Sequence, residues 1–263
     1  RRDSGQGATV QAILDGSDAN TATIVANYTR AVARSYSAEI QLDGRAFRPP
    51  VTLESRVWYN EELTSRNMIV PGLVAVIMMI IAAMLTSLTI AREWERGTME
   101  QLASTPVSRT EVVLGKLLPY VGIGLIDVAV VSLIGVFLFH VPFRGSAALL
   151  GALSLAFIIG SLGFGIFISA VARSQLLATQ MAMITTFLPA FLLSGFMYAI
   201  SVMPPVLEAV TYLVPARYFL VVTRGVFLKG VGTEALAGQG LLMIAFAAAG
   251  LTAATLVFKK EIA

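Results

Sequence analysis

The sequence predicts an all-α polytopic membrane protein with a small α/β extramembrane module at its N-terminal end. Of the 263 residues, 56% are hydrophobic and only 13% are charged, and the mean hydropathy is +0.78. An ordinary soluble domain has roughly 25% charged residues. The two kinds of residue are also separated along the chain, because residues 1–67 are polar and long uncharged runs begin at Met68. We therefore expect residues 68–263 to form a transmembrane domain.

Composition excludes several kinds of functional site. The chain has no Cys and a single His, His140, so thiol nucleophiles, disulfides and Cys- or His-rich metal sites are excluded. The net charge of +3 is small and spread through apolar sequence, unlike the clustered basic face of a nucleic-acid-binding protein. We predict no catalytic residue, no metal site, no cofactor bound by this chain and no nucleic-acid partner.

Residues 1–67 have a balanced charge, with eight Arg and eight acidic residues. Val10–Asp15 alternates apolar and polar residues as a strand does, and turn-forming residues follow it. Over Thr21–Ala38 apolar residues recur at every fourth position, which is typical of an amphipathic helix; they are Ile24, Tyr28, Val32 and Tyr36. Val51–Tyr59 is predicted to be a second strand. The small α/β module either has a structural role or binds a substrate or an adaptor.

Five runs in the apolar part of the chain are long enough to cross a bilayer, which takes about 20 residues. They cover residues 70–91, 117–139, 145–172, 174–198 and 235–258. They must be helices, because a backbone in hydrocarbon has to satisfy its own hydrogen bonds. The second run contains one acid, Asp127, and a charge within a span is costly. Asp127 therefore either lines a substrate path or fixes helix packing as a protonated or hydrogen-bonded acid.

The basic residues predict the orientation, since Lys and Arg accumulate in cytoplasmic loops. If the spans alternate, one side receives Arg92, Arg96, Arg109, Lys116, Arg173, Lys259 and Lys260. We expect that side to be cytoplasmic and residues 1–67 to be extracytoplasmic. A domain that precedes an inward-going span must itself have been carried across the membrane. We therefore expect one more transmembrane helix before Arg1, which gives six in all.

The stretch between Tyr198 and Glu234 stays apolar but is interrupted by prolines and charges. The pieces Val206–Val214 and Tyr218–Phe227 are each too short to cross a bilayer. Because Pro fixes turns and removes backbone donors, we expect re-entrant helices over about residues 203–229 that enter the outer leaflet. The alternative is an amphipathic loop that lies on the surface.

The segment AREWERGTMEQL, residues 91–102, directly follows the first run. On one helix, Glu93, Arg96 and Glu100 would share a face and form oppositely charged i,i+3 and i,i+4 pairs. Such a helix would lie flat in the membrane interface, with Trp94 at headgroup level. Ser108-Arg109-Thr110-Glu111 then predicts a capping box at the start of the next helix. From periodicity alone, a solvated amphipathic linker is an equal alternative for residues 92–104.

Five segments resemble the permeases of ABC-2 type exporters, the membrane subunits of bacterial multidrug-type ABC systems. They are RVWYNEELTSRNMIVPGL, REWERGTMEQLASTPVSRTEVVLGKLLPY, SGFMYAISVMPP, PARYFLVVTRGVFLKG and the terminal basic pair, and they follow the family's order over nearly the whole chain. The resemblance implies a type V exporter-like domain with six helices, including re-entrant helices before the last span. Its E-x-E-R-G-T-x-E pattern places a coupling helix at about residues 92–104, with the contact residues Glu93, Glu95, Arg96, Gly97, Thr98 and Glu100.

The resemblance also implies partners and a location. It implies a homodimer or heterodimer of permeases in the bacterial inner membrane, with cytoplasmic ATPase subunits. The chain has no G-x-x-x-x-G-K-[ST] loop for ATP phosphates, so we expect the partner to bind ATP and magnesium and this chain not to be an enzyme. Membrane lipid and a periplasmic adaptor complete the expected partners.

The expected function is the permease subunit of an ATP-binding cassette exporter, forming the pathway for an amphiphilic or drug-like substrate. An ion-coupled secondary transporter is the main alternative, because it too has polytopic and broken helices. Against it, the sequence shows no convincing internal repeat and one acid within the spans. A membrane enzyme or a scaffold is a weaker third class, since no nucleophile motif occurs in any loop.

Overall fold

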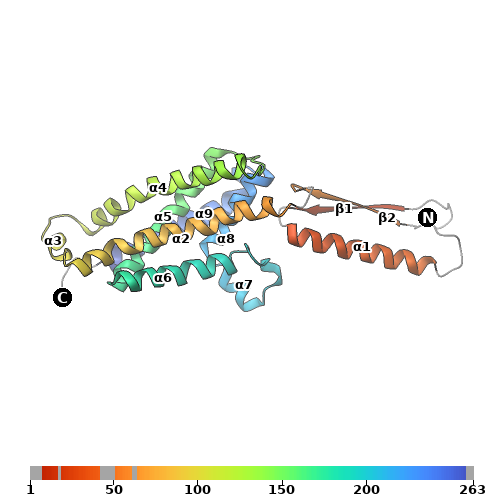
Figure 1. The fold of residues 1–263 in the computed structure, drawn as a ribbon. Helices are drawn as coiled ribbons and strands as arrows, with labels where there is room; N and C mark the ends of the chain where they lie inside the picture. The colour runs from red at the N-terminus through yellow and green to blue at the C-terminus, as the bar shows by residue number, and fades with distance from the viewer. Residues whose placement is uncertain (1–7, 17–18, 42–50, 61–63, 259–263) are drawn as a thin grey trace. The chain divides into compact units, whose positions relative to one another are not determined.

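The computed structural model describes residues 8–16, 19–41, 51–60 and 64–258. The chain divides into two compact units, residues 1–68 and residues 69–263. Figure 1 shows that the second unit is a bundle of long helices, whereas the first contains both strands.

The first unit is a β-α-β arrangement. Strand β1 (Ala8–Asp15) and strand β2 (Val51–Trp58) pair in parallel, with Ala8 opposite Val51 and Asp15 opposite Trp58. Helix α1 (Ala19–Gln41) makes the crossover that a parallel pair requires. The predicted order of strand, helix and strand is therefore confirmed.

Helix α1 packs through its alanines and exposes its larger apolar residues. Ala22 and Ala26 are buried with 3% of their surface exposed. The predicted apolar stripe is exposed in the structure; its members are Ile24, Tyr28, Val32 and Tyr36, at 54–71% exposure. A helix can approach a two-stranded sheet most closely through small side chains. The stripe is therefore present in the sequence but does not form the packed face of α1.

A side-chain network precedes the long helix α2 (Ser65–Arg96). The Oδ1 atom of buried Asn60 accepts hydrogen bonds from the backbone N–H and the hydroxyl of Thr64, both at 3.1 Å, and from the amide of Asn67 at 2.9 Å. The Asn60 amide donates to the Thr64 carbonyl at 3.1 Å. These bonds hold the Asn60 side chain against the first residues of α2.

Among the described residues, five helices are long and apolar enough to cross a membrane. They are α2, α4 (Arg109–Phe137), α5 (Ala147–Ala172), α6 (Gln175–Leu188) with its π-helical continuation η1 (Pro189–Leu193), and α9 (Thr233–Val257). They overlap the five predicted runs, although α2 and α4 begin before the predicted runs and the fourth span ends at Leu193 rather than at residue 198. The fold class predicted for this part of the chain is thus confirmed as all-α and polytopic.

Helix α5 lies at the centre of the second unit and packs through glycines. A Cβ atom on Gly165 would come within 2.1 Å of the Thr86 hydroxyl of α2, and one on Gly163 would come within 2.7 Å of the Gly250 backbone of α9. Small residues at these positions let the helix backbones approach closely, as expected for membrane helices. The geometry therefore supports a role for these glycines in helix packing.

Two hydroxyls join α5 to α2 by hydrogen bonds. The Ser169 hydroxyl accepts the backbone N–H groups of Ile90 and Ala91 at 3.0 and 2.9 Å. The Thr86 hydroxyl lies 2.9 Å from the Leu162 carbonyl oxygen, to which it donates. All five groups belong to buried residues, where an unpaired polar group is costly.

The segment between η1 and α9 contains two short helices joined at a sharp bend. Helix α7 (Pro205–Thr211) makes an angle of 78° with α8 (Pro215–Arg224) and its π-helical continuation η3 (Gly225–Lys229); a single 3₁₀ turn, Ile200–Val202, precedes α7. Phe219 and Phe227 are fully buried. A loop lying on the surface, the alternative considered above, does not fit this second piece.

Candidate functional site

The predicted coupling residues gather at one end of the second unit, here called the basic end and defined as residues 92–116 and 173–175. Here α2 ends, the short helix α3 (Met99–Ala103) follows, and α4 and α6 begin. Figure 1 shows α3 at this end of the helix bundle. The predicted basic residues Arg92, Arg96, Arg109, Lys116 and Arg173 lie here, while Lys259 and Lys260 lie outside the described residues.

Glu93 links α2 to α4. Its carboxylate forms a salt bridge with the ammonium group of Lys116, and the two side chains are 27% and 20% exposed. The helical spacing predicted Arg96 as the partner of Glu93, but in the described part of the chain the salt bridge of Glu93 is with Lys116. Glu93 and Lys116 are far apart in the sequence and meet because α4 runs antiparallel beside α2. The periodicity of a single helix cannot predict such a contact.

Glu95 links α2 to α6. One carboxylate oxygen accepts the backbone N–H of Gln175 at 2.7 Å, and the other accepts the side-chain amide of Gln175. Gln175 is the first residue of α6. Its amide oxygen also accepts from Arg92 at 3.4 Å. Glu95 therefore satisfies a backbone donor at the start of another helix, where a negative charge is favourable.

Trp94 links α2 to the end of α5. The guanidinium of Arg173 lies 4.7 Å from the centre of the Trp94 ring, a cation–π contact. Arg173 has a positive φ of 53° and caps the C-terminus of α5. Three consecutive residues of α2 thus each contact a different neighbouring segment.

Gly97 ends α2 and separates it from α3. Its φ is +70°, and the Gly97 and Thr98 N–H groups donate to the carbonyls of Trp94 and Glu93 at 3.2 and 3.1 Å. This is the Schellman arrangement, in which glycine at the left-handed position closes a helix. The structure therefore divides the expected helix over 92–104 in two, because Arg92–Arg96 complete α2 and only Met99–Ala103 form a separate helix. Glycine after a charged last turn is a recognisable stop signal.

Helix α3 presents charge outward from an anchored position. Met99 is buried, with 3% exposed, whereas Glu100 and Gln101 are exposed. The predicted capping box of α4 is confirmed, because Ser108 N–H donates to Glu111 at 2.7 Å and Glu111 N–H donates to the Ser108 hydroxyl at 3.3 Å. Both ends of the short connection are therefore fixed, and Glu100 lies on its exposed surface.

Asp127 lies away from the basic end, within α4. It is half-buried, and its neighbour Val128 is buried. At about 100° per residue, Asp127 falls on the flank of the α4 face that carries Gly124 and Val128. Asp127 does not line the apolar pocket that the second unit contains.

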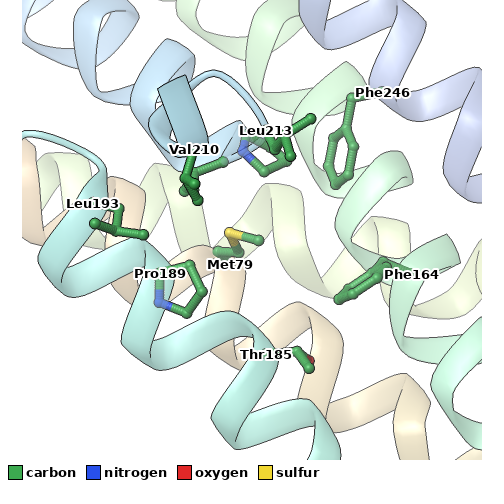
Figure 2. Close-up of a pocket in the computed structure, with 10 residues that line it drawn as sticks. Met79, Phe164, Thr185, Pro189, Leu193, Val210, Leu213 and Phe246 are labelled. Atoms are coloured by element: carbon green, nitrogen blue, oxygen red, sulfur yellow. The ribbon is translucent and has the colours of Figure 1, made fainter. Parts of the chain in front are cut away.

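A pocket of about 230 Å³ lies among α2, α5, α6 with η1, the α7–α8 bend and α9. It is lined by Met79, Phe164, Thr185, Pro189, Leu193, Val210, Leu213, Val214, Pro215 and Phe246. Figure 2 shows the rings of Phe164 and Phe246 on one side, and Pro189 and Leu193 on the other, with Met79 between them. Sequence reasoning did not single out these residues, because their spacing follows ordinary helical cores.

The fold and the basic end define a multi-pass membrane protein whose spans are joined to one another at a charged end. Residues 2–256 match the family described as ABC-2 family transporter protein. The chain belongs to this family.

Curated relatives carry permease names. The chain is 43% identical over 224 residues to the "Probable multidrug ABC transporter permease YbhS" of Escherichia coli strain K12, covering 85% of this chain and 59% of that protein. It is 32% identical over 263 residues to the "Probable multidrug ABC transporter permease YbhR" of the same strain, covering 99% and 70%. The "Inner membrane transport permease YhhJ" is 31% identical over 81% of this chain and 57% of that protein. The chain therefore spans about three fifths of the length of the first of these relatives.

Proposed function

We propose that this chain is the permease subunit of an ATP-binding cassette exporter and forms the path for an amphiphilic or drug-like compound. A separate cytoplasmic subunit supplies ATP hydrolysis, and two permease subunits form the complete pathway in the bacterial inner membrane. The names of the relatives and the family membership support this proposal. In it, residues 1–67 are extracytoplasmic, and a periplasmic adaptor is their candidate partner.

The observation that carries the proposal is the connection of the basic end to several spans. Glu93, Trp94 and Glu95 join α2 to α4, α5 and α6, respectively. Beyond them, α3 exposes Glu100 on a segment anchored by buried Met99. A force applied to α3 would reach the ends of four spans within a few residues. This is the arrangement needed to convert closure of an ATPase dimer into a change in the access of the pathway.

The exposure of the side chains supports two different roles within the proposed coupling set. Glu100 is exposed and can contact a partner, whereas Glu93 is partly buried and paired with Lys116. Replacement of Glu93 would therefore change both the internal salt bridge and any partner contact. Glu100 gives the cleaner test of the partner contact.

The test is Glu100→Lys in the full-length permease, reconstituted in lipid vesicles with its ATPase. We expect export of ethidium to fall while ATP hydrolysis continues, because reversing the charge on α3 disrupts the partner contact but not the ATPase. Glu208→Lys is the matched control, since Glu208 is an exposed acid on α7. Unchanged export by Glu100→Lys, or export driven by a proton or sodium gradient without ATP, would contradict the proposal.

A further inference from the structure

The pocket beside the α7–α8 bend is lined by residues from segments that are distant in sequence. Met79 comes from α2, Phe164 from α5, Pro189 from η1 and Phe246 from α9, while Val214 lies in the bend. Two of these walls have irregular backbone. The η1 wall is π-helical, and π-helical turns occur frequently at functional sites. A second wall, next to η1, is the 78° break between α7 and α8.

The lining is apolar, and its polar member is already satisfied. Nine of the ten lining residues are apolar, and the tenth, Thr185, has its hydroxyl 2.6 Å from the Met181 carbonyl oxygen. The lining side chains therefore offer neither a charge nor an unused donor to a ligand. A charged or strongly polar group in this pocket would lose its hydration without compensation. The occupant must be apolar where it contacts these residues.

The size of the pocket limits the occupant further. Its volume of about 230 Å³ exceeds the roughly 150 Å³ cavity that accommodates benzene. It is smaller than the roughly 300–1,000 Å³ of a pocket that encloses a whole drug-sized ligand. One ring with a small substituent fits, while the rest of a larger molecule has to lie outside the pocket.

We propose that this pocket binds a compact apolar group, a single aromatic ring or a short branched alkyl group, of the transported amphiphile. Phe164 and Phe246 offer ring faces or edges to an aromatic group, and Met79 provides an adaptable floor. The polar part of the same molecule remains outside the pocket. The identification of the ligand as a transported compound rests on the proposed function, whereas the binding of the apolar group is a property of this chain alone.

The test uses trifluoromethyl-phenyl-diazirine, a single-ring apolar probe that labels adjacent residues on illumination. The full-length permease is labelled in phosphatidylcholine vesicles without the ATPase, and the labelled residues are identified by mass spectrometry. We expect saturable labelling at Met79 and Phe164, which excess trifluoromethylbenzene reduces about tenfold, the change expected when a competitor occupies nine tenths of the sites.

Two variants and one control separate the pocket from the lipid-facing surface. Thr185→Trp and Leu213→Trp fill the pocket from opposite walls, and each should abolish the saturable labelling. Thr252→Trp is the control, because Thr252 is also exposed on a spanning helix, its hydroxyl also lies 2.6 Å from the carbonyl four residues earlier, and it is not among the lining residues. Labelling that neither saturates nor responds to the two pocket variants would show a lipid-occupied surface and overturn the proposal.

The outcomes distinguish the pocket from the transport function. If saturable labelling is lost in Thr185→Trp but ATP-driven export of ethidium never occurs, the apolar site stands and its ligand is not a transported compound, which overturns the assignment of that ligand. If export depends on ATP and on Glu100 but the probe does not label the pocket saturably, the proposed function stands and this site is wrong.

Discussion

Glu95 of α2 accepts a hydrogen bond of 2.7 Å from the backbone N–H of Gln175, the first residue of α6. The residue that directly precedes α6, Ser174, makes no capping hydrogen bond with its own side chain. A carboxylate from another helix therefore performs the task that an N-cap residue usually performs. The start of α6 depends on the position of the last turn of α2.

Replacement of Glu95 by Ala should loosen the first turn of α6. The N–H of Gln175 would lose its partner and the helix N-terminus would lose a nearby negative charge. We expect faster hydrogen exchange at the start of α6 and a lower unfolding temperature in detergent. Glu100→Ala, an exposed acid beyond Gly97, is the matched control and should leave this turn unchanged. Equal exchange in the wild type and Glu95→Ala would contradict the capping role.

A charge swap tests the pairing of Glu93 with Lys116. Glu93→Lys and Lys116→Glu should each lower the stability of the permease, since each places like charges together in a partly buried position. The double variant should recover on the order of 1 kcal/mol relative to the sum of the two single changes. Thermal unfolding of the four proteins measures this coupling, and simple additivity would exclude a direct interaction.

Alanine at Gly163 should force α5 away from α9. The new Cβ atom would lie 2.7 Å from the backbone carbon of Gly250, and a backbone cannot yield as a flexible side chain can. We expect a loss of about 1–3 kcal/mol in unfolding free energy. Gly151→Ala on the same helix is the control, because its Cβ would meet no atom within 4 Å. Similar stability of the two variants would refute the close approach.

Asparagine at Asp127 distinguishes a pathway role from a packing role. The half-buried position of Asp127 on the flank of the packed face of α4 favours packing. We therefore expect Asp127→Asn to keep export of ethidium, because asparagine retains the size and much of the hydrogen-bonding capacity of aspartate. Export lost at normal expression and unfolding temperature would instead assign Asp127 to the pathway.

Much of the fold could be predicted from the sequence, because hydropathy and periodicity are local properties. The five spanning helices, the β-α-β order of the first unit and the capping box at Ser108 and Glu111 are present in the structure as predicted. The end of α2 also had a local signal, Gly97 itself, but the prediction gave more weight to the amphipathic pattern around this glycine. The exposure of Tyr28 was not predictable from periodicity, which finds an apolar face but does not say what covers it.

The contacts of the basic end required the tertiary structure. Lys116, Arg173 and Gln175 each come from a different segment, and their partners Glu93, Trp94 and Glu95 are consecutive in α2. No spacing along one helix relates these pairs, because they depend on how the helices lie side by side. The E-x-E-R-G-T-x-E pattern indicated the right stretch of sequence, but only the structure assigns a separate neighbour to each of its first residues.

The two hydrogen bonds from α2 to Ser169 determine which displacements this protein can make at low cost. Sliding α2 along α5 by even one residue would break both contacts of the buried Ser169 hydroxyl with the backbone of α2. These two helices should therefore move together as a single rigid body. In the proposed transport cycle, a change of access then falls to α4 and α6, which are held at the basic end by polar contacts that can exchange with water. The permease would thus consist of a fixed frame and two moving helices, rather than of spans that all tilt equally.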